Sequence, residues 1–305
     1  MAKQRKTHSA AKTIWLVIFG LFGLTACITM LLMGTDIRLF NTKGLMAQQQ
    51  LNLGLFTMLL LFTIAVPTLI ILYGFAWHYR ESNDRAEYNA QTRHGKFFVF
   101  SIWAIPAVFM IVLALVVWPA TQRLDPKKSI ASDVKPLKIQ VVAMRWKWLF
   151  IYPEQNIATV NYIQVPVGTP LEFDLTADES PMSSFWIPHF SGQLYAMTGH
   201  VNRLNILAEE TGDYPGSSAE INGRGFAGMK FTARASSQAD FDKWMQEIKQ
   251  SPANLDTEQY GALLKPSENN PTALYSSYDT NLYDKMLMKY AGGKDGQPQE
   301  HGTGH

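Results

Sequence analysis

The sequence predicts an integral membrane protein in which a hairpin of two transmembrane helices precedes an all-β domain and a small helical segment. Two runs, 51–77 and 97–119, contain no charged residue. About 20 consecutive apolar residues are enough to span a bilayer as a helix. After residue 136, short segments alternate between apolar and polar side chains, which is the pattern of half-buried β-strands. The predicted fold class is therefore membrane α plus all-β.

Composition excludes several classes of function. The chain has 305 residues and a formal net charge of +2, without a basic stripe interleaved with aromatic residues. We therefore expect no nucleic-acid partner. The single cysteine, Cys27, excludes a disulfide within the chain and limits any thiolate metal site to one sulfur ligand.

The N-terminus has the features of a bacterial secretory signal. Basic residues up to Lys12 precede an uncharged run, and the ending Leu-Thr-Ala-Cys resembles a lipoprotein box, whose cysteine becomes acylated. We predict that residues 1–26 are a lipoprotein-type signal peptide, that Cys27 carries palmitate, and that 27–50 form a periplasmic segment.

A third membrane helix is the alternative for this region. The apolar run continues from Thr13 to Met33, which is about the length needed to cross a bilayer. Under both interpretations, the chain lies outside the cytoplasm from residue 35 to the start of the next membrane span.

The two uncharged runs predict membrane spans at 51–78 and 97–119, joined by a loop at 79–96. The N-terminal basic cluster places this loop in the cytoplasm by the positive-inside rule. The linker 120–136 and everything after it are then periplasmic, and the chain is a multi-pass protein of the bacterial inner membrane. Because neither span carries an ionisable residue, we expect both to act as scaffold in contact with lipid.

Alternating segments between residues 137 and 235 predict one β-domain. Leu137, Ile139 and Val141 alternate with polar neighbours, and further short runs follow, separated by Pro and Gly. Such a pattern favours an antiparallel sandwich or a Greek-key barrel. We expect a turn at 213–216 and a last strand that begins at Met229.

The segment 236–291 predicts helices rich in aromatic side chains. Ser237 is a candidate N-cap with Asp240 three residues later, before apolar residues at helical spacing. A second helix is expected around 281–290. The glycine-rich tail 292–305 is expected to be disordered, and its two histidines are not expected to form a metal site.

The two spans and the stretch Trp-Lys-Trp-Leu-Phe-Ile-Tyr-Pro at 146–153 resemble subunit II of the haem-copper terminal oxidases. The likeness runs from about Lys43 to Ala235, and the aromatic-rich segment after it resembles an extension of the quinol-oxidising branch. The resemblance implies a periplasmic cupredoxin-like Greek-key β-barrel followed by a small helical aromatic-rich extension.

Family members that oxidise cytochrome c hold a dinuclear copper centre in a Cys-x-Glu-x-Cys-x3-His-x2-Met loop with one upstream histidine. The matching positions here are occupied as follows: Ser218 and Asn222 for the cysteines, Phe226 and Ser183 for the histidines, with Glu220 and Met229 retained. Copper prefers thiolate and imidazole ligands. We therefore expect no metal, no cofactor and no catalytic residue in this chain.

The missing ligands imply how electrons reach the complex. Without a surface copper centre, a soluble cytochrome cannot donate through this subunit, so the resemblance implies subunit II of a proton-translocating respiratory ubiquinol oxidase. Haem and copper would then reside in the partner subunit I, and ubiquinol would bind the complex rather than this chain. Further oxidase subunits would complete the assembly.

Two alternatives remain open at this point. The donor could be menaquinol rather than ubiquinol. The chain could also be a membrane-anchored periplasmic binding module or copper chaperone, although the β-domain lacks the cluster of Cys, His or Met that a chaperone would present.

Some residues bear on proton uptake or invite a functional assignment. Quinol-oxidising relatives usually carry a glutamate at the cytoplasmic start of the second span, where this chain has Val99. Glu81 or Glu87 could substitute for it, or subunit I could supply the path alone.

Lone histidines at 189 and 200 are expected to be structural, because no second ligand lies at metal spacing. The aromatic residues of 146–152 are expected to pack against the core and against subunit I.

Overall fold

A computed structural model describes residues 40–81, 83 and 95–291. The expectations for the signal peptide, for Cys27, for a third membrane helix, for Glu87 and for the tail 292–305 lie outside the described residues. Every element below belongs to one compact unit that begins at Thr42.

Two long apolar helices follow the start of this unit. They are α2 (Leu45–His78) and α3 (Lys96–Arg123), and both are long and apolar enough to cross a membrane. Each helix is longer than its predicted span. The prediction used the uncharged residues, which show what part of a helix can lie in lipid, whereas the helix itself continues into polar residues beyond them. The Gln-rich start of α2 and the turn after Pro119 are therefore helical as well. Pro67 and Pro106 lie inside the helices, as expected.

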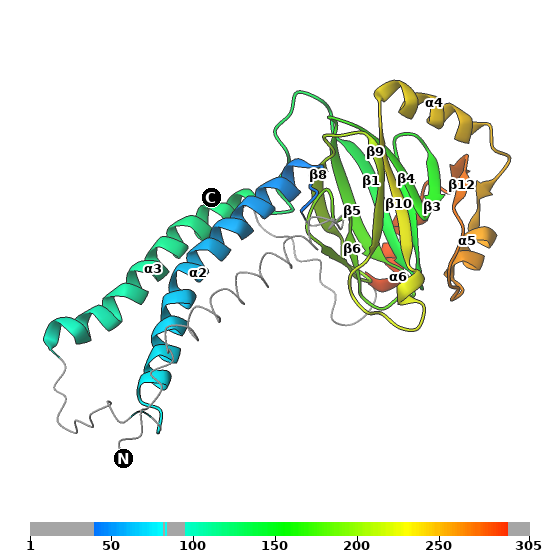
Figure 1. Cartoon of the computed structure of the whole chain (residues 1–305). Helices are drawn as coiled ribbons and strands as arrows, with labels where there is room; N and C mark the ends of the chain where they lie inside the picture. The colour runs from blue at the N-terminus through cyan, green and yellow to red at the C-terminus, as the bar shows by residue number, and fades with distance from the viewer. Residues whose placement is uncertain (1–39, 82, 84–94, 292–305) are drawn as a thin grey trace, which may run out of the picture. The chain divides into compact units, whose positions relative to one another are not determined.

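The β-domain is a sandwich of two sheets (Figure 1). One sheet has the order β12-β3-β2-β1-β5-β8 and the other the order β4-β10-β9-β6-β7. The strands of the first sheet are β1 (Leu137–Met144), β2 (Lys147–Tyr152), β3 (Ile157–Val160), β5 (Pro170–Ala177), β8 (Asn202–Leu207) and β12 (Ala273–Tyr275). Those of the second are β4 (Tyr162–Pro166), β6 (Ser183–Trp186), β7 (Leu194–Ala196), β9 (Gly212–Ser218) and β10 (Lys230–Ser236).

The sheets differ from the expectation in two respects. Parallel pairs β1–β5 and β4–β10 interrupt an otherwise antiparallel arrangement. In addition, the residues 213–216, predicted to form a turn, lie inside β9. Pro215 is tolerated there because β9 pairs with β6 only through Ser217 and Ser218, so no ladder partner on that side requires the missing N–H.

Strand β2 has both faces buried, and the two faces belong to different cores. Trp148, Phe150 and Tyr152 point into the core between the sheets, whereas Leu149 and Ile151 join a second core on the opposite face. Phe150 and Trp148 contact the ring of Phe185 at centroid distances of 6.2 and 5.3 Å. These aromatic residues are therefore part of the chain's own core and not an exposed stripe.

The C-terminal segment supplies the second core. It contains α4 (Gln238–Lys249), β11 (Asn254–Leu255), α5 (Thr257–Leu264), β13 (Ser277–Tyr278) and α6 (Leu282–Ala291). Ser237 caps α4 as predicted, since its Oγ accepts a hydrogen bond of 3.1 Å from the Asp240 N–H. The apolar face of α4 closes the core between the sheets, whereas α5 and α6 lie against the outer face of the six-stranded sheet (Figure 1). Strand β12 extends that sheet by pairing with β3.

Helix α2 begins in direct contact with the β-domain. The backbone N–H groups of Lys43 and Ala47 donate to the carbonyls of His189 and Phe190 at 2.8 and 3.1 Å, and Gly44 forms a bridge with Ala208. The first turn of a helix has N–H groups without intrahelical partners, and this contact satisfies one of them.

Candidate functional site

The positions aligned with the copper loop lie where β6, β9 and β10 meet. Ser183 begins β6, Ser218 ends β9, and Met229 directly precedes β10. The Ser218 N–H donates to the Met229 carbonyl at 3.1 Å, which closes the base of the loop 219–229.

The amide of Asn222 links three of these positions. Its Nδ2 donates to Ser183 Oγ at 2.7 Å and to Met229 Sδ at 3.2 Å. All three residues are buried, with Asn222 only 8% exposed. Asn222 therefore joins the start of β6 to the residue at the end of its own loop.

The other aligned positions do not join this cluster. Ser218 Oγ donates to the Glu220 carbonyl at 3.1 Å, within its own loop. Phe226 starts the short 3-10 helix η1 (Phe226–Gly228) and is half-buried. The half-buried Glu220 carboxylate makes no hydrogen bond or ion pair with any residue of the part described.

The side chains at these positions do not fit copper. A dinuclear copper site needs bridging thiolates and imidazoles, whereas these positions offer two hydroxyls, an amide, a carboxylate, a phenyl ring and one thioether. Within the described ranges, no three His, Cys, Asp or Glu side chains come together as a metal site. Hydrogen bonds are the interactions that the structure shows among these side chains.

Trp146 packs against the same loop. It adopts the left-handed backbone conformation with φ of 64°, at the turn between β1 and β2. A Cβ added to Gly225 would lie 2.4 Å from Trp146 Cδ2, so only glycine leaves room for the indole. The sequence alone did not predict that Trp146 contacts Gly225, because the two residues are distant in the chain.

A cluster that sequence inspection missed surrounds the buried carboxylate of Asp178. Its oxygens accept hydrogen bonds from Tyr260 at 2.5 Å, from Tyr290 at 2.6 Å and from Lys289 at 3.0 Å. Lys289 also lies 2.6 Å from Glu179. Burial and then the Asp178 carboxylate raise the pKa of Tyr260, so its hydroxyl remains a donor at neutral pH.

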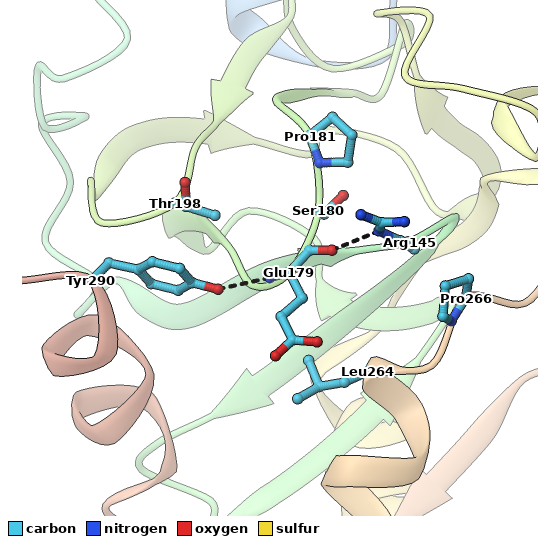
Figure 2. A pocket seen from close by; sticks show the side chains of 8 residues that line it. All are labelled: Arg145, Glu179, Ser180, Pro181, Thr198, Leu264, Pro266 and Tyr290. Carbon is cyan, nitrogen blue, oxygen red and sulfur yellow. Dashed lines mark hydrogen bonds between the residues drawn. The ribbon is translucent and has the colours of Figure 1, made fainter. Parts of the chain in front are cut away.

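A shallow pocket of about 590 Å³ lies beside this cluster. Figure 2 shows Arg145 and Tyr290 approaching Glu179 from opposite sides. Arg145 Nε donates to the Glu179 carbonyl at 2.9 Å, and the Tyr290 hydroxyl accepts from the Glu179 N–H at 2.9 Å. Its lining is Arg145, Glu179, Ser180, Pro181, Thr198, Leu264, Pro266 and Tyr290. The pocket is therefore built mainly from contacts that fix the loop between β5 and β6.

The remaining candidates lie elsewhere in the described part. Glu81 is exposed just after α2, and Val99 lies in the first turn of α3. His189 is 5% exposed, with its ring 5.1 Å from that of Tyr214, whereas His200 is exposed.

Fold and site together define a cupredoxin-like domain that follows two apolar helices and whose loop 219–229 offers no thiolate or imidazole. A family model, the COX Aromatic Rich Motif, matches residues 249–294.

Sequence relatives give the family. The chain is 45% identical to the cytochrome bo(3) ubiquinol oxidase subunit 2 of Pseudomonas putida, over 93% of this chain and 90% of that protein. It is 41% identical to the same subunit of Pseudomonas aeruginosa, over 90% of this chain and 82% of that protein. A quinol oxidase subunit 2 of Bacillus cereus is 32% identical to this chain, over 82% of this chain and 86% of that protein. This chain belongs to the ubiquinol oxidase subunit 2 family.

Solved structures resemble parts of the chain. The periplasmic domain of cytochrome oxidase subunit II from Bradyrhizobium japonicum aligns with 39% of this chain and 96% of its own, at 21% identity and a TM-score of 0.37. A chain of a heme-copper terminal oxidase dimer aligns with 45% of this chain and 98% of its own, at 17% identity and a TM-score of 0.35. The family assignment rests on the sequence relatives.

Proposed function

We propose that this chain is the second subunit of a proton-translocating respiratory complex that oxidises ubiquinol and reduces O2 to water. In this role it carries no redox centre of its own. Haem and catalytic copper belong to the partner subunit I, ubiquinol binds the complex, and further oxidase subunits complete it. The helices α2 and α3 anchor the chain in the bacterial inner membrane, with the β-domain in the periplasm.

The observation that best supports this proposal is the hydrogen-bonded loop at the positions aligned with the copper ligands. The Asn222 amide contacts both Ser183 and Met229 where copper ligands would have to converge. Electrons cannot enter through an amide, a hydroxyl and a thioether, so a soluble cytochrome has no acceptor in this domain. A quinol that donates within the membrane part of the complex removes the need for such an acceptor.

Purification of a tagged chain from solubilised membranes tests the proposal. Haem-containing partner subunits should copurify, and the preparation should oxidise ubiquinol with O2 uptake while leaving reduced cytochrome c unoxidised. A chain that purifies without haem and without quinol oxidase activity would contradict the proposal. It would instead favour a free-standing binding module.

The donor can be assigned in the same preparation. Both Pseudomonas relatives are named ubiquinol oxidase subunits, and they are closer in sequence than the Bacillus relative. We expect faster turnover with ubiquinol than with menaquinol, and extraction of ubiquinone from the source membranes. A preference for menaquinol would overturn the choice of donor but not the role of the subunit.

Acylation of Cys27 is part of the proposal. Removal of residues 1–26 and lipidation of the new N-terminus would give the chain a lipid anchor in addition to its two helices. Intact-mass measurement should show a diacylated or triacylated Cys27. A mature chain that retains Met1 would favour a third membrane helix.

We propose that the acids of the predicted cytoplasmic loop assist proton uptake. They would do so in place of the glutamate that quinol-oxidising relatives usually carry at the position of Val99. Glu81 is exposed beside the end of α2, and Glu87 belongs to the same predicted loop. The double variant Glu81→Gln, Glu87→Gln should slow turnover and lower proton release per electron. Unchanged values would leave proton uptake to subunit I alone.

A further inference from the structure

The aromatic-rich segment reaches all three loops that surround the aligned copper positions. We call its residues 254–291 the strap. The first loop is the turn between β1 and β2, the second runs from Asp178 to Met182 and leads into Ser183, and the third is the loop 219–229. The three loops are far apart in the chain, so each needs a tie to keep its place.

The strap holds the first loop through a buried lysine. Lys147 is 1% exposed, and its Nζ donates to the carbonyls of Leu263 and Lys265 at 2.7 and 2.9 Å. These carbonyls lie at the C-terminal end of α5, where a positive charge is favourable and where helical carbonyls otherwise lack donors. Lys147 therefore fixes the end of α5 beside Trp146.

The second loop is held by the Asp178 cluster. Tyr260 from α5 and Lys289 and Tyr290 from α6 all donate to this one carboxylate, which is 1% exposed. Hydrogen bonds to a charged group contribute more to stability than hydrogen bonds between neutral groups. Because the carboxylate is buried, loss of its donors is costly, and this cluster is the strongest tie.

The third loop is held mainly by close packing. A Cβ on Gly228 would lie 2.5 Å from Asn269 Oδ1, so the loop and the strap are in tight contact there. Arg224 Nε lies 2.7 Å from Glu268 Oε1, but Arg224 is 84% exposed, and exposed ion pairs contribute little. Steric fit, and not charge, sets the position of this loop against the strap.

We propose that the strap performs the structural task that a metal ion performs in a copper-containing site of this fold: it holds the loop 178–182 and the loop 219–229 in a fixed mutual position. Asn222 ties the loop 219–229 to Ser183, the residue that follows the loop 178–182, and the strap supports both loops from outside. This inference concerns the fold around the aligned positions and goes beyond the proposed oxidase role.

Hydrogen–deuterium exchange of the purified complex tests the strap. The triple variant Tyr260→Phe, Lys289→Met, Tyr290→Phe removes the donors to Asp178. Exchange in the peptide 178–183 should accelerate about tenfold or more, as loss of charged hydrogen bonds predicts. The peptide 219–229 should also exchange faster. The matched control, Tyr278→Phe with Lys285→Met, alters the strap at side chains that make no hydrogen bond with these loops and should leave both peptides unchanged.

A second experiment asks whether bound copper can restore the slow exchange of these two peptides, which would show that a metal ion can perform the same structural task as the strap. The same triple variant would also carry Ser183→His, Ser218→Cys, Asn222→Cys and Phe226→His. Addition of copper should return both peptides to the slow exchange of the wild type. Unchanged exchange of 219–229 in the triple variant, or copper binding without restored protection, would overturn the proposal. Ubiquinol oxidation by the wild-type complex is measured separately, so its absence would count against the proposed function and not against the strap.

Discussion

Asn222 and Ser183 lie 39 positions apart in the chain and are joined by a buried hydrogen bond of 2.7 Å. The same amide contacts Met229 Sδ at 3.2 Å. The bond crosses from the loop 219–229 to the start of β6, and it adds a side-chain tie to the backbone hydrogen bond of 2.9 Å from the Ala219 N–H to the Ser184 carbonyl.

Truncation of this amide should destabilise the protein. Asn222→Ala removes both contacts and leaves the buried Ser183 hydroxyl without its donor, at a cost of about 1–3 kcal/mol in the free energy of unfolding. Chemical denaturation of the detergent-solubilised chain measures the loss. The adjacent Ile221 is 78% exposed, and Ile221→Ala should change stability by less than about 0.5 kcal/mol. Equal effects of the two variants would contradict the structural role of Asn222.

Installation of copper ligands should convert the loop into a metal site. The variant with Ser218→Cys, Asn222→Cys, Ser183→His and Phe226→His supplies the thiolates and imidazoles that the native site lacks. A folded variant should bind copper and turn purple, as checked by visible absorption and metal analysis. The matched control omits only the two cysteines and should remain colourless. A folded variant that binds no copper would show that the positions are wrongly aligned.

Alkaline pH should destabilise the protein in part through Tyr260. Its pKa is raised above the ordinary 10.0 by burial and by the Asp178 carboxylate. Above pH 10 the unfolded chain releases this proton while the folded chain keeps it, so the folded state binds more protons and stability falls as pH rises.

A comparison of variants isolates this contribution. The unfolding midpoint of Tyr260→Phe should depend less steeply on pH above 10 than that of the wild type. Tyr195→Phe removes an exposed tyrosine and serves as the matched control. Parallel pH profiles of wild type and Tyr260→Phe would count against a raised pKa.

The junction between α2 and the β-domain should tolerate no side chain at Gly44. A Cβ there would lie 2.7 Å from the Leu207 carbonyl oxygen and 3.0 Å from Phe190 Cα, both of them backbone atoms. Gly44→Ala should therefore lower the free energy of unfolding by about 1–3 kcal/mol through overpacking. Thermal unfolding in detergent and the yield of assembled complex report the effect.

Gly54 provides the control for this junction. It lies within α2, of which Gly44 is the N-cap, and a Cβ added to Gly54 meets no atom within 4 Å. Gly54→Ala should be neutral or slightly stabilising, since alanine has the higher helix propensity. Equal losses for Gly44→Ala and Gly54→Ala would point to a general cost in the helix and not to the junction.

Local patterns predicted much of the fold because they reflect burial on one element at a time. The capping of α4 by Ser237 and the alternation at Leu137, Ile139 and Val141 are both present in the structure. The same logic failed at 213–216, where Pro and Gly suggested a turn. Pairing of β9 with its neighbours allows an extended Pro215, and this pairing cannot be read from the four residues themselves.

The sequence by itself determined that two stretches can enter a membrane and that the copper positions lack thiolates and imidazoles, because charge and ligand chemistry belong to each residue wherever it lies. Only the tertiary structure decided which contacts the side chains at the aligned positions make. Asn222 meets Ser183, and Asp178 meets Lys289 and Tyr290 more than 100 positions away, through long-range strand pairing and packing. Such contacts depend on how whole sheets and helices come together, and no local period encodes them.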